Sequence, residues 1–397
     1  MTEPSPPRPL RTTLLLAAGL SAALILGWAG FVVFAPSPSP VVAVAAPDAR
    51  PASQGGQALR VLTLGDVLPA DVVKQYENQQ GVRVAIDIVH DDEDALRRFV
   101  DTPPDAAIVT GVELARLASE TRLAVLSPAR IPTAGDLHPL LVASGAAYDI
   151  GNRHSLALGW HALGIAYDAQ AIRQRLGEAA NEPSWRWLFD LDTAAKLADC
   201  GIVADDDVVE TFAAAFVHLD RPIASQNVGD YEAAAQIWEK VRPMIAAFGA
   251  QEVQARLADG RACLALTMSD TAYRARVAAR TRDASTALTF AVPREGSLAR
   301  DLFLVMPATV RDSRPAETLF AFLLRPEIAA GMMARTGLIS ALPKGIAALP
   351  PDVRTDASLS VTRMGLTREA DPGAQLRGLR TRYWNLIDAP GLAAPIQ

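Results

Sequence analysis

The sequence contains few of the residues that metal and redox chemistry require. Its 397 residues include two cysteines and five histidines. Cys200 and Cys263 are too far apart for a CxxC motif or a zinc knuckle, and the histidines form neither HExxH nor another ligand spacing. We therefore expect no metal site and no cofactor. From the residues alone, the cysteines are either buried thiols or partners in one disulfide, and the compartment decides which.

Signatures of catalysis and of nucleic-acid binding are also missing. The sequence has no GxGxxG, GxxxxGK[ST] or GxSxG motif, and we find no cluster suited to acid–base or nucleophilic chemistry. With 44 acidic and 38 basic residues the net charge is −6, and no basic patch indicates nucleic acid. We therefore predict a protein that is not an enzyme. The mild acidity is compatible with a cationic ligand without proving one.

A long apolar run lies near the N-terminus. Residues 14–35 carry no charge and are numerous enough to cross a bilayer as a helix. Arg8 and Arg11 precede the run, and the segment directly after it has neither Lys nor Arg, which predicts export of the remaining chain. Residues 1–35 are either an uncleaved signal-anchor, which we favour, or a secretory signal cleaved after the A-x-A match at 43–45. No cysteine stands directly after the run, which excludes a lipoprotein anchor.

Residues 36–58 are rich in Pro, Ala and Ser and are predicted to form a linker. From Leu59 onward, short apolar or alternating runs alternate with helical periodicity, which predicts a parallel sheet covered on both faces. The expected strands are 59–64, 82–89, 105–109, 262–266, 289–292 and 302–306. The expected helices are 71–79, 93–100, 112–119, 231–248, 315–324 and 326–336.

Several segments of the exported part follow one another in a characteristic order. They are 68–77 with 81–84, Trp160 with 164–168, 230–234, 240–245, 257–260, 292–296, 323–327 and 379–384. No single segment is specific. Together, in order and spacing, they resemble the putrescine- and spermidine-binding proteins of bacterial ABC transporters, that is, the polyamine solute-binding family.

The resemblance implies an α/β, two-lobed periplasmic binding protein fold of the type II kind, with parallel or mixed sheets and flanking helices. Lobe I is expected at 59–157 and 300–347, and lobe II at 158–299 and 348–392. A ligand would lie between the lobes, on the periplasmic side of the bacterial inner membrane. The resemblance also implies that Cys200 and Cys263 form a disulfide, because relatives carry one at matching places.

The resemblance further implies a set of ligand-binding residues, in which carboxylates would hold ammonium groups. In the first loop Asp66 remains, while both aromatic residues of the family pattern are missing at 64–67. Thr110 corresponds to a family serine, and Glu210 to a carboxylate before a hydrophobic-Phe pair. Asp207 matches an additional carboxylate of the spermidine branch, so the acidic turn at 205–207 is either partly ligand-facing or a solvated loop.

Two further motifs depart from the family pattern. Met268 replaces a cation-facing tryptophan, and Thr271 stands at an aspartate position, with Asp270 one place earlier. Asp301 is one place away from an expected aspartate, and a shift of one residue in a strand turns a side chain to the other face. If Arg300 faced the cleft instead, it would repel an ammonium group. A polyamine, a smaller or less cationic amine, and an amino acid derivative therefore all remain open as the ligand.

These patterns leave three functions. The first is the binding component of a polyamine-type ABC importer, with a permease in the inner membrane as partner. The second is a membrane-tethered sensor or accessory binding protein with an altered ligand. The third, an enzyme on a similar two-lobed fold, lacks a nucleophile or acid–base cluster in the sequence.

Overall fold

The computed structural model describes residues 58–388. The predicted N-terminal segment 1–35 and all of the predicted linker except its last residue lie outside the described residues. Within the described part, no helix is both long enough and apolar enough to span a bilayer.

The described strands join in the order β2-β1-β3-β9-β4-β7-β5-β6, with β8 and β10 beside β4 and β11 beside β9. β1 pairs in parallel with β2 and β3, whereas β9 pairs with β3 in antiparallel fashion, so the sheet is mixed. The strand bounds are β1 Leu59–Leu64, β2 Val84–Val89, β3 Ala106–Thr110, β4 Ser155–Asp168, β5 Ile202–Ala204, β6 Ile245–Phe248, β7 Leu264–Met268, β8 Leu288–Ala291, β9 Leu298–Val305, β10 Ile339–Ser340 and β11 Thr367–Arg368.

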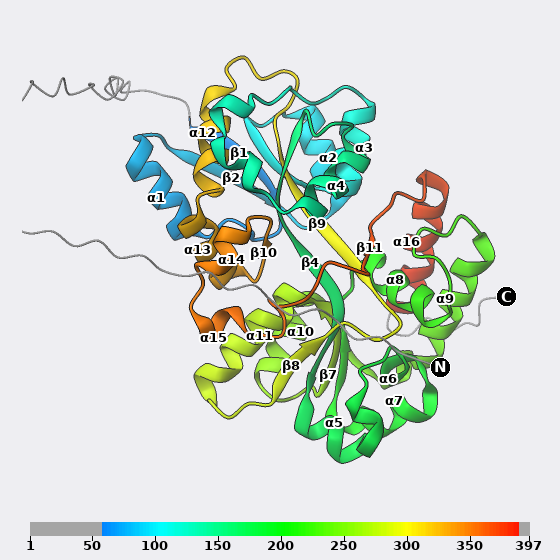
Figure 1. Ribbon diagram of the computed structural model, residues 1–397. Coiled ribbons are helices and arrows are strands. Elements are labelled where there is room, and N and C mark those ends of the chain that lie inside the picture. The colour runs from blue at the N-terminus through cyan, green and yellow to red at the C-terminus, as the bar shows by residue number, and fades with distance from the viewer. Residues whose placement is uncertain (1–57, 389–397) are drawn as a thin grey trace, which may run out of the picture. The chain divides into compact units, whose positions relative to one another are not determined.

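Two groups of elements lie at opposite ends of the long strands β4 and β9 (Figure 1). We call the group built on β1, β2 and β3 the first lobe, and the group built on β5, β6, β7 and β8 the second lobe. The helix bounds are α1 Ala70–Gln80, α2 Asp92–Asp101, α3 Gly111–Ser119, α4 Pro139–Tyr148, α5 Ala169–Leu176, α6 Arg186–Phe189, α7 Leu191–Leu197, α8 Val208–His218, α9 Val228–Val241, α10 Ala250–Ala258, α11 Ser269–Arg282, α12 Arg314–Leu323, α13 Pro326–Thr336, α14 Pro343–Ala347, α15 Pro351–Arg354 and α16 Ala374–Asp388.

The strands β4 and β9 connect the lobes. The first part of β4 pairs with β9 and β10, and its last part pairs with β7 and β8. The register shifts between Ala157 and Gly159, where a Cβ atom on Gly159 would lie 2.6 Å from the Ile339 carbonyl oxygen. Only glycine allows β10 to approach β4 this closely, and such irregularities bend a strand.

The second lobe has a core that is rich in aromatic side chains. Phe189 and Trp238 meet edge to face with their ring centroids 5.0 Å apart, and Trp238 meets Trp384 in the same way at 5.4 Å. Pairs of this geometry stabilise a core beyond the area they bury. The largest fully buried side chains of this core are Trp185, Phe212, Phe216, Tyr231 and Trp238.

The predicted disulfide is present. Cys200 precedes β5 and Cys263 precedes β7, which are neighbouring parallel strands. The two cysteines are bonded, with their Cα atoms 5.5 Å apart. The pairing that the family resemblance implied is therefore confirmed, and the bond lies entirely within the second lobe.

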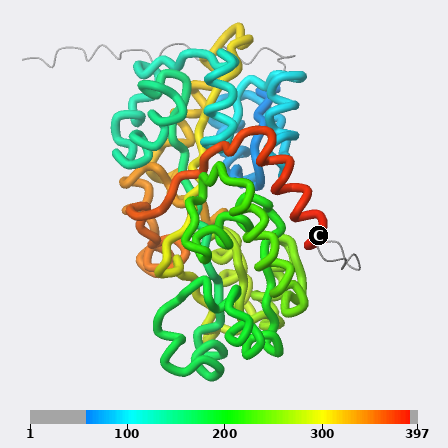
Figure 2. The backbone as a smooth tube through the Cα atoms, turned by 90° about the vertical axis from the view of Figure 1, so that its right-hand side faces the viewer, coloured from blue at the N-terminus to red at the C-terminus, as the bar shows by residue number. Residues whose placement is uncertain are grey.

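The last described segment contacts both lobes. In Figure 2 it crosses beside the first lobe and continues as α16 along the second. Tyr148 of α4 donates a hydrogen bond of 2.6 Å to the carbonyl oxygen of Glu369, and Arg377 of α16 lies 3.3 Å from the Glu93 carboxylate of α2. Trp384 of α16 packs on Trp238 of α9. The segment thus joins elements that belong to different lobes.

Most of the elements expected from the sequence are present, and two differ. The helix expected over 231–248 ends at Val241, because Pro243 cannot donate a helical hydrogen bond, and Ile245–Phe248 instead form β6. The strand expected from residue 302 begins at Leu298. The lobe boundaries expected from the resemblance stay a prediction.

Candidate functional site

The acidic turn at 205–207 joins β5 to α8. Asp207 is the N-cap of α8, and its Oδ1 accepts hydrogen bonds from the backbone N–H groups of Val209 (2.7 Å) and Glu210 (3.2 Å). Such a cap satisfies donors that the first helical turn leaves free. It also fixes Asp207 and Glu210 beside each other at the carboxyl end of β5.

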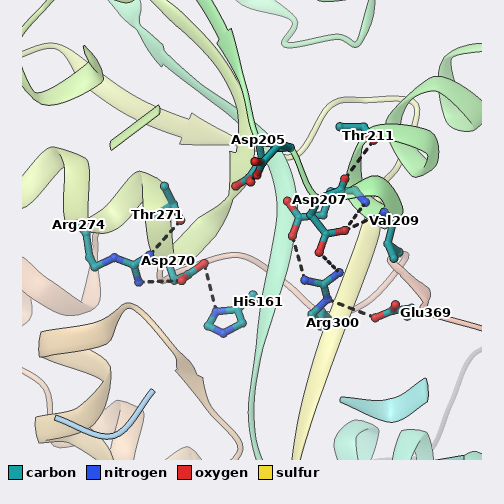
Figure 3. A network of polar contacts seen from close by, with 12 residues as sticks. His161, Asp205, Asp207, Val209, Thr211, Asp270, Thr271, Arg274, Arg300 and Glu369 are labelled. Carbon is teal, nitrogen blue, oxygen red and sulfur yellow. Dashed lines mark hydrogen bonds and ion pairs between the residues drawn. The ribbon is translucent and has the colours of Figure 1, made fainter. Parts of the chain in front are cut away.

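Arg300 of β9 lies at the centre of this cluster (Figure 3). Its guanidinium donates to Asp207 Oδ2 (3.1 Å), Glu210 Oε1 (3.0 Å) and Glu369 Oε2 (3.3 Å). Only 9% of Arg300 and 3% of Glu210 are exposed to solvent. A buried guanidinium needs such partners, because an unpaired charge in a dry site is costly. We call Arg300, Asp207, Glu210 and Glu369 the Arg300 cluster.

The cluster holds more acid than one guanidinium neutralises. Burial, followed by repulsion from Asp205 and Asp207, raises the pKa of Glu210 well above its ordinary value, and Arg300 offsets this only in part. Burial, with the same kind of repulsion, raises the pKa of Asp205 to about 7. The second oxygen of Glu210, Oε2, is buried without a hydrogen-bond partner among the described residues. This oxygen is an open acceptor for a cationic donor.

Asp207 behaves differently from its acidic neighbours. Burial acts to raise its pKa, but the charge of Arg300 and the backbone donors of α8 outweigh burial, so that the pKa lies below the ordinary value. Asp207 is therefore the ionised partner of Arg300 at neutral pH. The neighbouring acids have no comparable number of donors, and they are the groups that a ligand cation would ionise.

A second polar group forms at the start of α11. Arg274 donates to Asp270 Oδ2 (2.8 Å), to Thr271 Oγ1 (3.0 Å) and to the Thr336 carbonyl oxygen (2.9 Å). His161 of β4 has its Nδ1 3.5 Å from Asp270 Oδ1, too far for a good hydrogen bond. Burial lowers the pKa of His161, whereas His161 and Arg274 overcome burial and lower that of Asp270 to about 2. We call these residues the Asp270 cluster.

The first lobe contributes further buried acid. Glu113 is fully buried, and its Oε2 accepts a 2.6 Å hydrogen bond from the Thr110 amide, while its Oε1 has no partner among the described residues. Burial raises the pKa of Glu113 well above its ordinary value, as does the nearby Asp92. Burial also raises the pKa of Asp92 to about 7, and Arg300 only partly offsets it. Acids of both lobes therefore lie within electrostatic range of one another.

The structure brings four of the expected site residues into the two clusters. They are Asp207, Glu210, Asp270 and Thr271. Met268 is buried directly before α11, next to the Asp270 cluster in sequence. In Figure 3, Asp205 lies between the Arg300 cluster and the Asp270 cluster.

Three expected site residues lie apart from these clusters. Asp301 accepts hydrogen bonds from Arg363 (3.1 and 3.2 Å) and from Ser144, so its carboxylate is paired on the opposite side of β9 from Arg300. Thr110 caps α3 in a capping box with Glu113. Asp66 is exposed, and it belongs to neither cluster. The one-residue shift noticed in the sequence thus makes Arg300, not Asp301, the residue beside Glu210.

The sequence analysis missed some residues of the site. Glu369 comes from a segment with no recognisable motif, 69 positions from Arg300. Asp92 and Glu113 were indistinguishable from ordinary acids in the first turns of helices, which the helix dipole favours. Asp205 was part of the acidic turn already noticed, and its place directly after a buried strand was the available signal.

The comparisons place this chain in a known family. Residues 71–360 match the model of the bacterial extracellular solute-binding proteins, and the chain belongs to that family. The match confirms the prediction of a solute-binding protein that is not an enzyme.

Individual relatives are more specific. The chain is 29% identical over 334 residues to a putrescine/agmatine-binding protein of Pseudomonas aeruginosa, covering 81% of this chain and 89% of the relative. It is 25% identical over 342 residues to the putrescine-binding periplasmic protein PotF of Escherichia coli, covering 83% and 90%. Among solved structures, the spermidine/putrescine ABC transporter substrate-binding protein PotD of Streptococcus pneumoniae superposes with a TM-score of 0.67 at 19% identity, over 84% of this chain and 100% of that one. The structural likeness confirms the two-lobed α/β fold.

Proposed function

We propose that the protein is the extracytoplasmic binding component of an ABC importer and that it holds a small amine between its lobes. The observation that carries the proposal is Glu210 Oε2, buried beside Asp205 and without a hydrogen-bond partner among residues 58–388, in a chain whose relatives include putrescine- and agmatine-binding proteins. An ammonium group would supply the missing donor and ionise the neighbouring acids. Charged hydrogen bonds of this kind contribute about 1.5–3 kcal/mol each.

The site proposed for the amine consists of Glu210 and the neighbouring Asp205. Of the other residues expected from the sequence, Asp207, Asp270 and Thr271 pair with the arginines beside this site, and Met268 directly precedes α11. Ligand contacts by Asp66, Thr110 and Asp301 stay predictions. The lobe boundaries 59–157 with 300–347 and 158–299 with 348–392 are likewise part of the proposal.

The proposal also includes the cellular place of the protein. The uncharged run 14–35 would keep the chain attached to the inner membrane, with the binding lobes on the periplasmic side and a permease as partner. N-terminal sequencing of the protein from native membranes tests the anchor. A mature form beginning directly after the A-x-A match at 43–45 would replace the anchor with a cleaved signal.

Substitution of Glu210 by glutamine tests the amine site. Because burial favours the neutral form of Glu210, Glu210→Gln should leave the melting temperature without ligand nearly unchanged. It should weaken amine binding about ten- to a hundredfold, since the amide cannot ionise. Calorimetry of the full-length protein in detergent, with a panel of amines and amino acids, measures both the ligand and the loss.

Glu252→Gln provides the matched control. Glu252 occupies the same third position of helix α10 as Glu210 does of α8, but it is exposed and pairs with Arg256 on the surface. Its substitution should not change amine affinity. Equal affinities in the wild type and in Glu210→Gln would remove Glu210 from the site, and the absence of amine binding by the wild type would refute the proposed function.

A further inference from the structure

The Arg300 cluster contains its own cation. The guanidinium uses three of its N–H groups on Asp207, Glu210 and Glu369, at 3.0–3.3 Å. These three carboxylates come from α8 and from the segment before α16, and none of them is more than about a third exposed. The guanidinium donates charged hydrogen bonds to these carboxylates, which an ammonium group of a ligand would otherwise supply.

Acceptor capacity remains on one side of the cluster only. Asp207 Oδ1 is used by the helix cap, and one oxygen of Glu210 is used by Arg300. What remains is Glu210 Oε2, which is buried without a partner in the described part of the chain, together with Asp205, which accepts a hydrogen bond from the Asp206 amide. Asp205 lies between the two clusters in Figure 3. On the far side, Arg274 already pairs with Asp270.

A second ammonium group would meet an unfavourable environment. A diamine whose first ammonium binds Glu210 Oε2 and Asp205 has to place its second near fixed positive charge, because Arg300 and Arg274 occupy the flanking carboxylates. The second ammonium and these guanidinium groups carry like charges, which repel strongly where little water screens them. Neither cluster therefore offers the second ammonium an uncompensated carboxylate, and the other buried acids with raised pKa values, Asp92 and Glu113, belong to the first lobe.

From this arrangement we infer that Arg300 is a built-in substitute for one ligand ammonium, and that the site selects small amines through a single ammonium group. The inference rests on the proposed function and deepens it, because it assigns a ligand class: amines with one cationic end and an uncharged chain. Arg300 is then the residue that sets specificity, because it already pairs with the carboxylates that a second ammonium group would need, so that a second charge adds no affinity.

The test compares two ligands that differ only in their second amino group. 1,4-Diaminobutane and 1-aminobutane are titrated by calorimetry into the full-length protein in detergent. The wild type should bind the two within about threefold of each other, because the second ammonium finds no free partner. In Arg300→Met the three carboxylates lose their cation, and the diamine should become at least about tenfold tighter than the monoamine.

Arg314→Met is the control for removal of a positive charge. Arg314 is exposed and pairs only with the nearby Asp312, so this variant should keep the wild-type preference. Arg300→Lys retains the charge and should also keep it. If Arg300→Met does not fold, the wild-type comparison and Arg300→Lys decide the question by themselves.

The outcomes separate this inference from the proposed function. A wild type that binds the diamine about tenfold or more tightly than the monoamine overturns the role of Arg300 but leaves amine binding intact. A diamine preference that appears in Arg300→Lys also overturns it. A wild type that binds neither amine, nor any other amine of the panel, refutes the proposed function and the inference with it.

Discussion

Asp205 is a carboxyl group in an unusual environment. It is 6% exposed, directly follows the buried strand β5, and is followed by two further acids, Asp206 and Asp207. Burial and these neighbours raise its pKa to about 7. The folded protein therefore binds a proton here in a pH range where the unfolded chain has already lost it.

This proton makes the stability of the folded protein depend on pH. The contribution of Asp205 is fully present below the unfolded pKa of about 4 and is lost as the pH rises through 7. Asp205→Asn removes the titration and keeps the oxygen that accepts from the Asp206 amide. Relative to the wild type, the variant should gain on the order of a few kcal/mol between pH 5 and pH 8. Urea unfolding at both pH values measures the gain.

Asp192→Asn is the appropriate comparison, because Asp192 is exposed in the first turn of α7 and is not among the charges that act on Asp205. Its unfolding free energy should follow that of the wild type at both pH values. If Asp205→Asn tracked the wild type equally closely, Asp205 would be an ordinary ionised carboxylate, and its place in the amine site would lose its electrostatic basis.

The N-cap residue of α8 has a partner outside its own lobe, whereas that of α7 does not. Asp190 caps α7 by accepting from the Thr193 amide at 3.0 Å, and it pairs otherwise only with neighbours in sequence, Thr193 and Arg186. Asp207 caps α8 and also pairs with Arg300 of β9. The start of α8 therefore couples the second lobe to a strand that enters the first lobe.

This difference predicts unequal effects of removing the two caps. Asp190→Ala should lower the free energy of unfolding by about 1 kcal/mol, the usual value of a cap. Asp207→Ala should lower it by about 2–4 kcal/mol, because it also leaves a buried guanidinium short of a partner. Denaturant unfolding of both variants provides the comparison. Equal losses would show that the pair with Arg300 contributes nothing to stability.

The sequence predicts most elements of the first lobe because each strand there is a short apolar run and each helix has an amphipathic period. It does not predict β4 as one strand, because Gly159 and Gly164 weaken the strand pattern. Both glycines are required by tertiary packing: a Cβ atom would lie 2.6 Å from the Ile339 carbonyl oxygen and 2.5 Å from that of Ala291, respectively. Contacts of this kind have no local signal.

The sequence likewise predicts some residues of the candidate site and not others. Asp207 and Glu210 follow from the family pattern, since they sit at the start of one helix. Glu369, a partner of Arg300, does not follow from that pattern, because tertiary contacts bring its segment to the cluster: the pairing of β11 with β9 and the hydrogen bond from Tyr148. The side of β9 that faces the cleft depends on register, which a sequence without its neighbouring strands leaves open.

The disulfide constrains only the second lobe. Cys200 and Cys263 are 63 positions apart, and a link across a loop of this length stabilises a protein by about 4 kcal/mol in the chain-entropy model. The double variant Cys200→Ala/Cys263→Ala should lose stability of this order, and the reduced wild type a similar amount. Calorimetric melting with and without reductant measures both.

Amine affinity should hardly change in the reduced protein, because neither cysteine belongs to the Arg300 cluster or the Asp270 cluster. Loss of binding without loss of stability would mean that the bond positions the turn at 205–207 directly. Unchanged stability after full reduction would show that the loop is already restricted in the unfolded chain.

The order of the strands in the sheet has a consequence for biosynthesis. β9 lies between β3 and β4, yet it is made long after both of them. While the chain is being synthesised, β3 keeps a free edge of backbone donors and acceptors until residue 305 has emerged, and such edges invite pairing with other chains. The first lobe, whose strands are synthesised first, is therefore completed only when β9 has been synthesised.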